Sequence, residues 1–114
     1  MTLEQEIEFV ENLGRNLVET FARKRADYGP TTTETFEKFG PASMLVRMHD
    51  KLGRLDNLLG TGRIPSVNES VEDTLIDLAN YCLITMLELY KQKQKECVPC
   101  DAANVANIIY GIKR

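Results

Sequence analysis

One segment, ESVEDTLIDLANYCLITMLELY (residues 69–90), constrains the fold most, because its apolar residues recur at the spacing of a long helix. We expect this helix to span about residues 67–93, with Ser66 or Asn68 as its N-cap. Cys82 lies on the apolar stripe and is expected to be a buried thiol. The predicted core stripe is Val71, Leu75, Leu78, Ala79, Cys82, Met86 and Leu89, and the opposite polar stripe is Glu69, Asp73, Asp77 and Asn80.

Asp77 is the unusual residue of this segment, since apolar side chains surround it on both sides along the helix. An ionised carboxylate buried without a partner costs several kcal/mol. Asp77 must therefore be paired with a base, bound to a metal or protonated. We expect it to be mostly buried and to face the second long helix.

The remainder of the chain predicts an all-α fold, a bundle of three main helices (about 2–27, 41–59 and 67–93) with short helices near 34–39 and 102–110. Thr2 and Gln5 have the spacing of a capping box at the start of the first helix. The whole chain, 1–114, is expected to be a single helical domain. The predicted seam of the second helix is Leu45, Met48, Leu52, Leu55 and Leu59.

A basic stripe follows the other side of the second helix, where Arg47, Lys51 and Arg54 share one face with Asp50. Lys24, near the end of the first helix, can join them. Two interpretations remain open at this point. The bases and acids form a salt-bridge lattice between helices, or they line a pocket for a phosphorylated ligand, with oxygens on successive turns that suit a divalent cation.

Composition excludes some classes of function. The net charge of −3 argues against general nucleic-acid binding, which depends on clustered Lys and Arg. The N-terminus lacks the features of a secretory signal, and no apolar run is long enough to cross a membrane, so a cytoplasmic location is expected. Cys97 and Cys100 form a lone C-x-x-C, for which incidental thiols in a loop are preferred over a zinc site shared between subunits. His49 is expected at the surface.

Four segments in order, KRADYG (24–29), FEKFG (36–40), LVRMHDKLGRLDNLL (45–59) and ESVEDTLIDLANY (69–81), resemble the nucleotide modification associated domain, first class, of phages and bacteria. The resemblance covers about residues 5–90 and leaves 91–114 as an extension. It implies a helical domain connected with nucleotide metabolism or modified bases, in the host cytoplasm if the protein is phage-encoded. In outline the chain is also similar to the all-alpha nucleotide pyrophosphohydrolases, the MazG and dimeric dUTPase group.

Those pyrophosphohydrolases bind magnesium through Glu-x-x-Glu and Glu-x-x-Asp motifs, and this chain departs from both. The second helix offers only Asp50, and Thr74 stands where the second motif would place a glutamate before Asp77. No catalytic residue is assigned. Mg²⁺, if it binds, is expected at Asp50, Glu69, Asp73 and Asp77.

The expected function is binding of a nucleotide or nucleotide-derived phosphate ligand between the helices, with or without magnesium-dependent hydrolysis. One alternative is a non-catalytic phage protein that sequesters a signalling nucleotide. Another is a ligand-free oligomeric interaction protein. We also expect a homo-oligomer whose interface uses surplus apolar surface of the long helices and the segment around Ile108 and Ile109. The expected ligand-binding residues are Lys24, Tyr28, Arg47, Lys51, Arg54 and Asn80.

Overall fold

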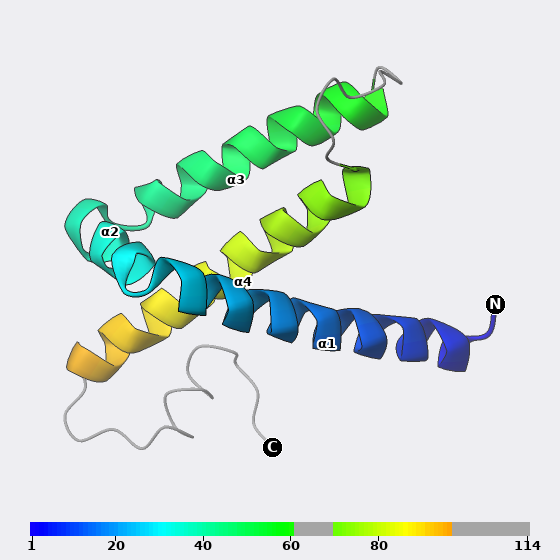
Figure 1. Cartoon of the computed structure of the whole chain (residues 1–114), viewed down its shortest axis with the longest axis horizontal. Coiled ribbons are helices and arrows are strands. Elements are labelled where there is room, and N and C mark those ends of the chain that lie inside the picture. The colour runs from blue at the N-terminus through cyan, green and yellow to red at the C-terminus, as the bar shows by residue number, and fades with distance from the viewer. Residues whose placement is uncertain (61–69, 97–114) are drawn as a thin grey trace.

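The protein is a bundle of helices, as the computed structural model shows for residues 1–60 and 70–96 (Figure 1). These residues contain no strand, so the predicted all-α fold is confirmed. None of their helices combines the length and apolar character that a membrane span requires. The elements in order are α1 (Leu3–Tyr28), α2 (Thr31–Phe39), α3 (Ala42–Leu55), the π-helical turn η1 (Asp56–Gly60) and α4 (Val71–Glu96).

Local sequence signals set the helix starts. Thr2 caps α1 as predicted, because its hydroxyl accepts a bond from the Gln5 backbone while the Gln5 side chain accepts one from the Thr2 backbone. In α4 an equivalent reciprocal pair joins Ser70 and Asp73. Helix α4 therefore begins at Val71, four residues later than predicted, and ends at Glu96 instead of 93. The two caps predicted upstream, Ser66 and Asn68, lie outside the described residues.

Two other helices of the confirmed bundle differ in detail from the prediction. Helix α2 begins at Thr31, three residues before the predicted start, because Pro30 has the fixed φ of a helix start and no N–H to leave unpaired. The second long helix is α-helical only to Leu55 and then widens into η1, instead of continuing as an α-helix to 59. The short helix expected at 102–110 lies outside the described residues.

Two glycines make the sharp turns that bring α1, α2 and α3 together. Gly29 has φ +59° and Gly40 has φ +75°, both in the left-handed region that side chains disfavour. The N–H of each bonds to the helix before it, at Arg25 and Phe36. Each helix therefore ends where a glycine allows the chain to reverse.

Helices α3 and α4 lie side by side and α1 crosses α4, with the N-terminal half of α1 projecting away from the other helices (Figure 1). Buried side chains from three helices form the core: Phe36 of α2, Met44 of α3 and Ile84 of α4. Phe21, Met48 and Tyr81 pack against this cluster. Within residues 1–60 and 70–96 this core is small, since many large apolar side chains of these residues are exposed.

The predicted core stripe of α4 was wrong, although Asp77 on the polar stripe faces α3 as predicted. Thr74, Asn80, Ile84 and Glu88 are its buried residues. The predicted core stripe instead faces outward along much of its length, and the thiol of Cys82 is exposed rather than buried. Polar partners on α1, α2 and α3 explain the reversal, because they hold the polar side of α4 inward. The outward residues of the predicted core stripe are Leu75, Cys82, Met86 and Leu89.

The predicted seam of α3 was only partly right. Leu55 is buried and Met48 packs against the core, whereas Leu45, Leu52 and Leu59 are exposed. Met44 of α3 points into the core instead, so the buried face of α3 differs from the predicted seam. His49 is exposed, as expected.

Candidate functional site

A pocket of about 240 Å³ opens where α1, α2, α3 and α4 meet. Its apolar wall combines two core residues with the aromatic rings packed against them, and threonines of α2 supply hydroxyls. Because all four helices contribute, the pocket exists only in the folded bundle. It is lined by Phe21, Lys24, Arg25, Tyr28, Thr31, Thr32, Thr35, Met44, Arg47, Asn80, Tyr81 and Ile84.

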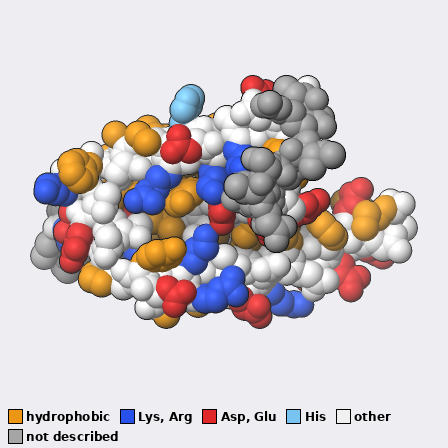
Figure 2. All heavy atoms as spheres, turned by 45° about the horizontal axis from the view of Figure 1, so that its top comes forward, with side chains coloured by type: hydrophobic (Ala, Val, Ile, Leu, Met, Phe, Trp, Pro, Cys, Tyr) orange, Lys and Arg blue, Asp and Glu red, His pale blue; other side chains and the backbone are white. Residues whose placement is uncertain are grey.

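Three basic side chains give the pocket its charge: Lys24 and Arg25 from α1 and Arg47 from α3. Figure 2 shows Lys and Arg side chains gathered near hydrophobic ones on one face of the molecule. Arg47 is exposed and forms no ion pair with any residue in 1–60 or 70–96. The guanidinium of Arg25 lies 5.7 Å from the centre of the Phe21 ring, within the range of a cation–π contact.

Two buried polar atoms in the lining lack a hydrogen-bond partner within the described part of the chain. They are Oδ1 of Asn80, on a residue only 2% exposed, and Nη1 of Arg25. A buried polar group without a partner costs about 1–3 kcal/mol. Both atoms belong to residues that line the pocket.

Asp77 lies beside the pocket and is held by two lysines. Its Oδ1 accepts from Lys24 Nζ at 2.8 Å and its Oδ2 from Lys51 Nζ at 3.0 Å. Burial by itself raises the pKa of Asp77, but the bonds from Lys24 and Lys51 outweigh this and hold the pKa below its ordinary 3.8. The side chain faces α3 as predicted, although at 24% exposed it is only partly buried.

Glu88 forms a second ionic network on α4, one that the sequence did not reveal. Its Oε1 accepts from Arg25 Nη2 at 2.7 Å, from Thr33 Oγ1 at 2.8 Å and from Lys91 Nζ at 3.3 Å. The residue is 2% exposed. Burial raises the pKa of Glu88, and the hydrogen bonds from Arg25, Thr33 and Lys91 more than compensate, so the pKa lies below 4.5. Glu88 thereby fixes Arg25 at the pocket wall.

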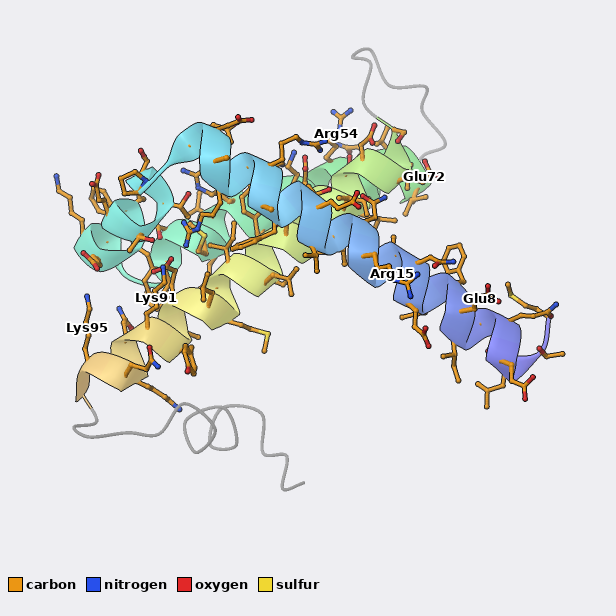
Figure 3. All side chains as sticks on the ribbon, turned by 60° about the horizontal axis from the view of Figure 1, so that its bottom comes forward. Glu8, Arg15, Arg54, Glu72, Lys91 and Lys95 are labelled. Atoms are coloured by element: carbon orange, nitrogen blue, oxygen red, sulfur yellow. The ribbon has the colours of Figure 1, made fainter. Side chains whose placement is uncertain are left out.

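The other two predicted basic ligands lie outside the pocket lining. Lys51 is engaged with Asp77. Arg54 donates from Nε to Thr74 Oγ1 at 3.2 Å, which ties α3 to α4 near the start of α4 (Figure 3). Thr74 is fully buried and also donates to the Ser70 carbonyl at 3.0 Å. These contacts belong to the lattice interpretation of the basic stripe.

The predicted magnesium ligands do not come together among the residues that the structure describes. Asp77 is bonded to two ammonium groups, Asp73 caps the first turn of α4, and Asp50 is exposed on α3. Glu69 lies outside the described residues. Within 1–60 and 70–96, no three His, Cys, Asp or Glu side chains form a group suited to a metal ion. A carboxylate cluster for Mg²⁺ therefore does not fit this part of the chain.

The structure brings four of the six predicted ligand-binding residues to one pocket: Lys24, Tyr28, Arg47 and Asn80. The sequence prediction missed Arg25 and the threonines of α2. Arg25 stands next to Lys24 in the KRADYG segment, and its place in that segment was the only sequence feature that could have marked it as a candidate. The polar residues are thus divided between a lattice at Asp77 and a basic pocket beside it.

The model of a family described as nucleotide modification associated domain 1 matches residues 24–89. The matched span includes every residue of the pocket lining except Phe21. Neither a curated protein nor a solved structure shows significant similarity to the chain.

Proposed function

The chain belongs to the family of nucleotide modification associated domain 1, and on that premise we propose that its four-helix pocket binds a nucleotide or a nucleotide-derived phosphate. The observation that carries the proposal is the buried Oδ1 of Asn80, unpartnered within the described residues, in a pocket with three basic side chains. Buried polar atoms in folded proteins nearly always have partners. Because Oδ1 is covered in this structure, a ligand supplies the missing partner only when it displaces part of the lining.

The lining divides into a charged part and a neutral part, as a nucleotide requires. Lys24, Arg25 and Arg47 suit a phosphate, because charge-assisted bonds to oxyanions are about twice as strong as neutral ones. The Asn80 amide is suited to the donor and acceptor edge of a base, and the aromatic rings of the lining offer a surface for stacking. The volume of about 240 Å³ is below the roughly 300–1,000 Å³ of sites for drug-sized ligands, so the pocket would enclose part of the ligand.

The arrangement of the acidic side chains favours binding of the nucleotide without hydrolysis. Asp77, the most central of the predicted metal ligands, already has two lysine partners, and a cation there would have to displace both. We therefore assign no catalytic residue and give magnesium no role in the proposed function. In a phage setting, such a protein would act by sequestering a nucleotide signal.

The test is a panel of nucleoside mono-, di- and triphosphates and cyclic dinucleotides, titrated calorimetrically into the full chain with and without Mg²⁺. Release of phosphate or pyrophosphate is followed in the same samples. Saturable binding without turnover supports the proposal, and turnover that requires Mg²⁺ would replace it by the pyrophosphohydrolase interpretation. No binding by any member of the panel would refute it.

A further inference from the structure

Helix α4 has its polar and apolar faces reversed relative to an ordinary surface helix. Its inward side carries Asp77, Asn80 and Glu88, whereas its outward side carries large exposed apolar residues. A soluble helix normally places its apolar stripe against the core. This outward surface, which we call the α4 outer face, has no partner in the described part of the chain. Its residues Leu75, Leu83, Met86 and Leu89 are between 37% and 47% exposed, and Cys82 is exposed among them.

The spacing of the α4 outer face is that of a helix–helix seam. Apart from Leu83, these residues together with Ala79 follow one another at steps of three and four, the pattern that keeps one stripe facing a second helix. The stripe extends beyond the apolar residues at both ends, to an exposed acid and an exposed base. In chain order it is Glu72, Leu75, Ala79, Cys82, Met86, Leu89 and Lys93.

The two charged ends make the stripe complementary to itself. Glu72 and Lys93 lie about 32 Å apart along the helix at 1.5 Å per residue. Neither has an ion-pair partner within residues 1–60 and 70–96. Figure 3 shows Glu72 at one end of α4, with Lys91 and Lys95 near the other. When two such stripes pack antiparallel, each Glu72 meets the Lys93 of the other helix.

We propose that the α4 outer face binds the same face of a second copy of this chain, antiparallel, about a two-fold axis near Cys82 and Leu83. The axis lies there because these residues are halfway between Glu72 and Lys93. A two-fold interface requires a patch that is complementary to itself. The α4 outer face meets that condition, since it is apolar in the middle and oppositely charged at its ends. The dimer leaves the pocket on the inward side of α4 open to ligand.

The first test is the mass of the full chain by light scattering at micromolar concentration. We expect a multiple of the 12.9 kDa chain mass, and a monomer would overturn the proposal. Met86→Glu buries a carboxylate in the interface and should weaken association at least about tenfold. The matched control is Val46→Glu on α3, which adds the same charge at an exposed apolar residue on another helix. Circular dichroism establishes that both variants keep their helices.

Charge reversal tests the antiparallel arrangement and needs no core substitution. Glu72→Lys and Lys93→Glu should each weaken association, because each places like charges opposite one another. The double variant restores the pairs with exchanged signs and should recover most of the wild-type affinity. Failure of the double variant to recover, or equal masses for Met86→Glu and wild type, would show that the chain associates by another surface or not at all, and would overturn the proposal.

Cross-linking tests the position of the axis. In a chain with Cys97→Ser and Cys100→Ser, mild oxidation should join Cys82 of the two copies efficiently. The control carries Cys82→Ala and Val46→Cys, and it should cross-link only at the rate of random collision. Equal yields from both would contradict an axis near Cys82.

Discussion

Lys24 Nζ lies 2.8 Å from Asp77 Oδ1, which joins α1 to α4 through a carboxylate that also receives Lys51 from α3. This relationship explains why a carboxylate occurs in the apolar segment of α4. It also connects the lattice to the pocket, because Lys24 contributes to both. Substitutions in the lattice should therefore change mainly the stability of the fold, and substitutions in the pocket should change mainly the binding of the ligand.

Asp77→Asn should lower the free energy of unfolding by about 1–3 kcal/mol. The figure is below the roughly 3–5 kcal/mol for breaking a fully buried pair, because water reaches both Asp77 and Lys24. Chemical denaturation measures the change. Asp50→Asn, at an exposed acid on α3, is the control and should change stability by less than about 0.5 kcal/mol. Equal effects of the two substitutions would contradict the role given to Asp77.

Asn80→Leu should raise stability and abolish ligand binding together. Replacing a buried amide whose Oδ1 has no partner within residues 1–60 and 70–96 by an apolar group of similar size removes a penalty of about 1–3 kcal/mol. The same change removes the group proposed to meet the ligand. The two measurements are the denaturation midpoint and the affinity for whichever nucleotide of the panel binds. A destabilised Asn80→Leu would mean that the amide has a structural partner in solution.

Arg47→Ala should weaken nucleotide binding by about 1.5–3 kcal/mol, the range for hydrogen bonds to charged groups, and leave the fold unchanged. Arg47 is suited to this test because it lines the pocket and has no ion pair to lose within the described residues. Arg15→Ala is the matched control, since Arg15 lies on the projecting half of α1 and bonds to Asn12 there (Figure 3). If both variants bind with wild-type affinity, the phosphate lies elsewhere.

Glu88→Gln should be the most destabilising of these substitutions, at about 2–4 kcal/mol. A glutamine at this position would keep the shape of the side chain but leave the partly buried Arg25 without its counter-charge. The denaturation midpoint reports the loss. Glu37→Gln breaks the exposed pair with Lys95 and is the control, with an expected change below about 1 kcal/mol. A Glu88→Gln variant as stable as this control would show that the buried network contributes little.

Stability should fall in acid. The folded-state pKa values of Asp77 and Glu88 lie below 3.8 and 4.5, so the unfolded chain binds more protons than the folded chain as the pH falls. Their contribution is complete above about pH 5 and is lost progressively below the ordinary pKa values of the two groups. Urea denaturation at a series of pH values measures this. The double variant Asp77→Asn, Glu88→Gln should show a flatter dependence between about pH 5 and pH 3, and an unchanged slope would contradict the assignment.

Much of the helical architecture was accessible from the sequence, because its causes are local. The capping box at Thr2, the turns at Gly29 and Gly40 and the periodic apolar residues depend on neighbours a few positions away. The boundaries failed where two local signals competed, as at Pro30 and Ser70. The charges of Lys24 and Arg47 and the amide of Asn80 could likewise be selected as candidates from their residue type and their helical spacing.

Which face of α4 points inward was decided only by the tertiary structure. Periodicity locates an apolar stripe and a polar stripe but does not say which one meets the other helices. Here Lys24, Lys51 and Arg25 supply partners that stabilise Asp77 and Glu88 inside, so the polar stripe is buried and Cys82 is turned out. Residues such as Lys24 and Asp77 are 53 positions apart, and nothing local couples them. The sequence determined the helices and their chemistry, and packing across these long separations determined the pocket.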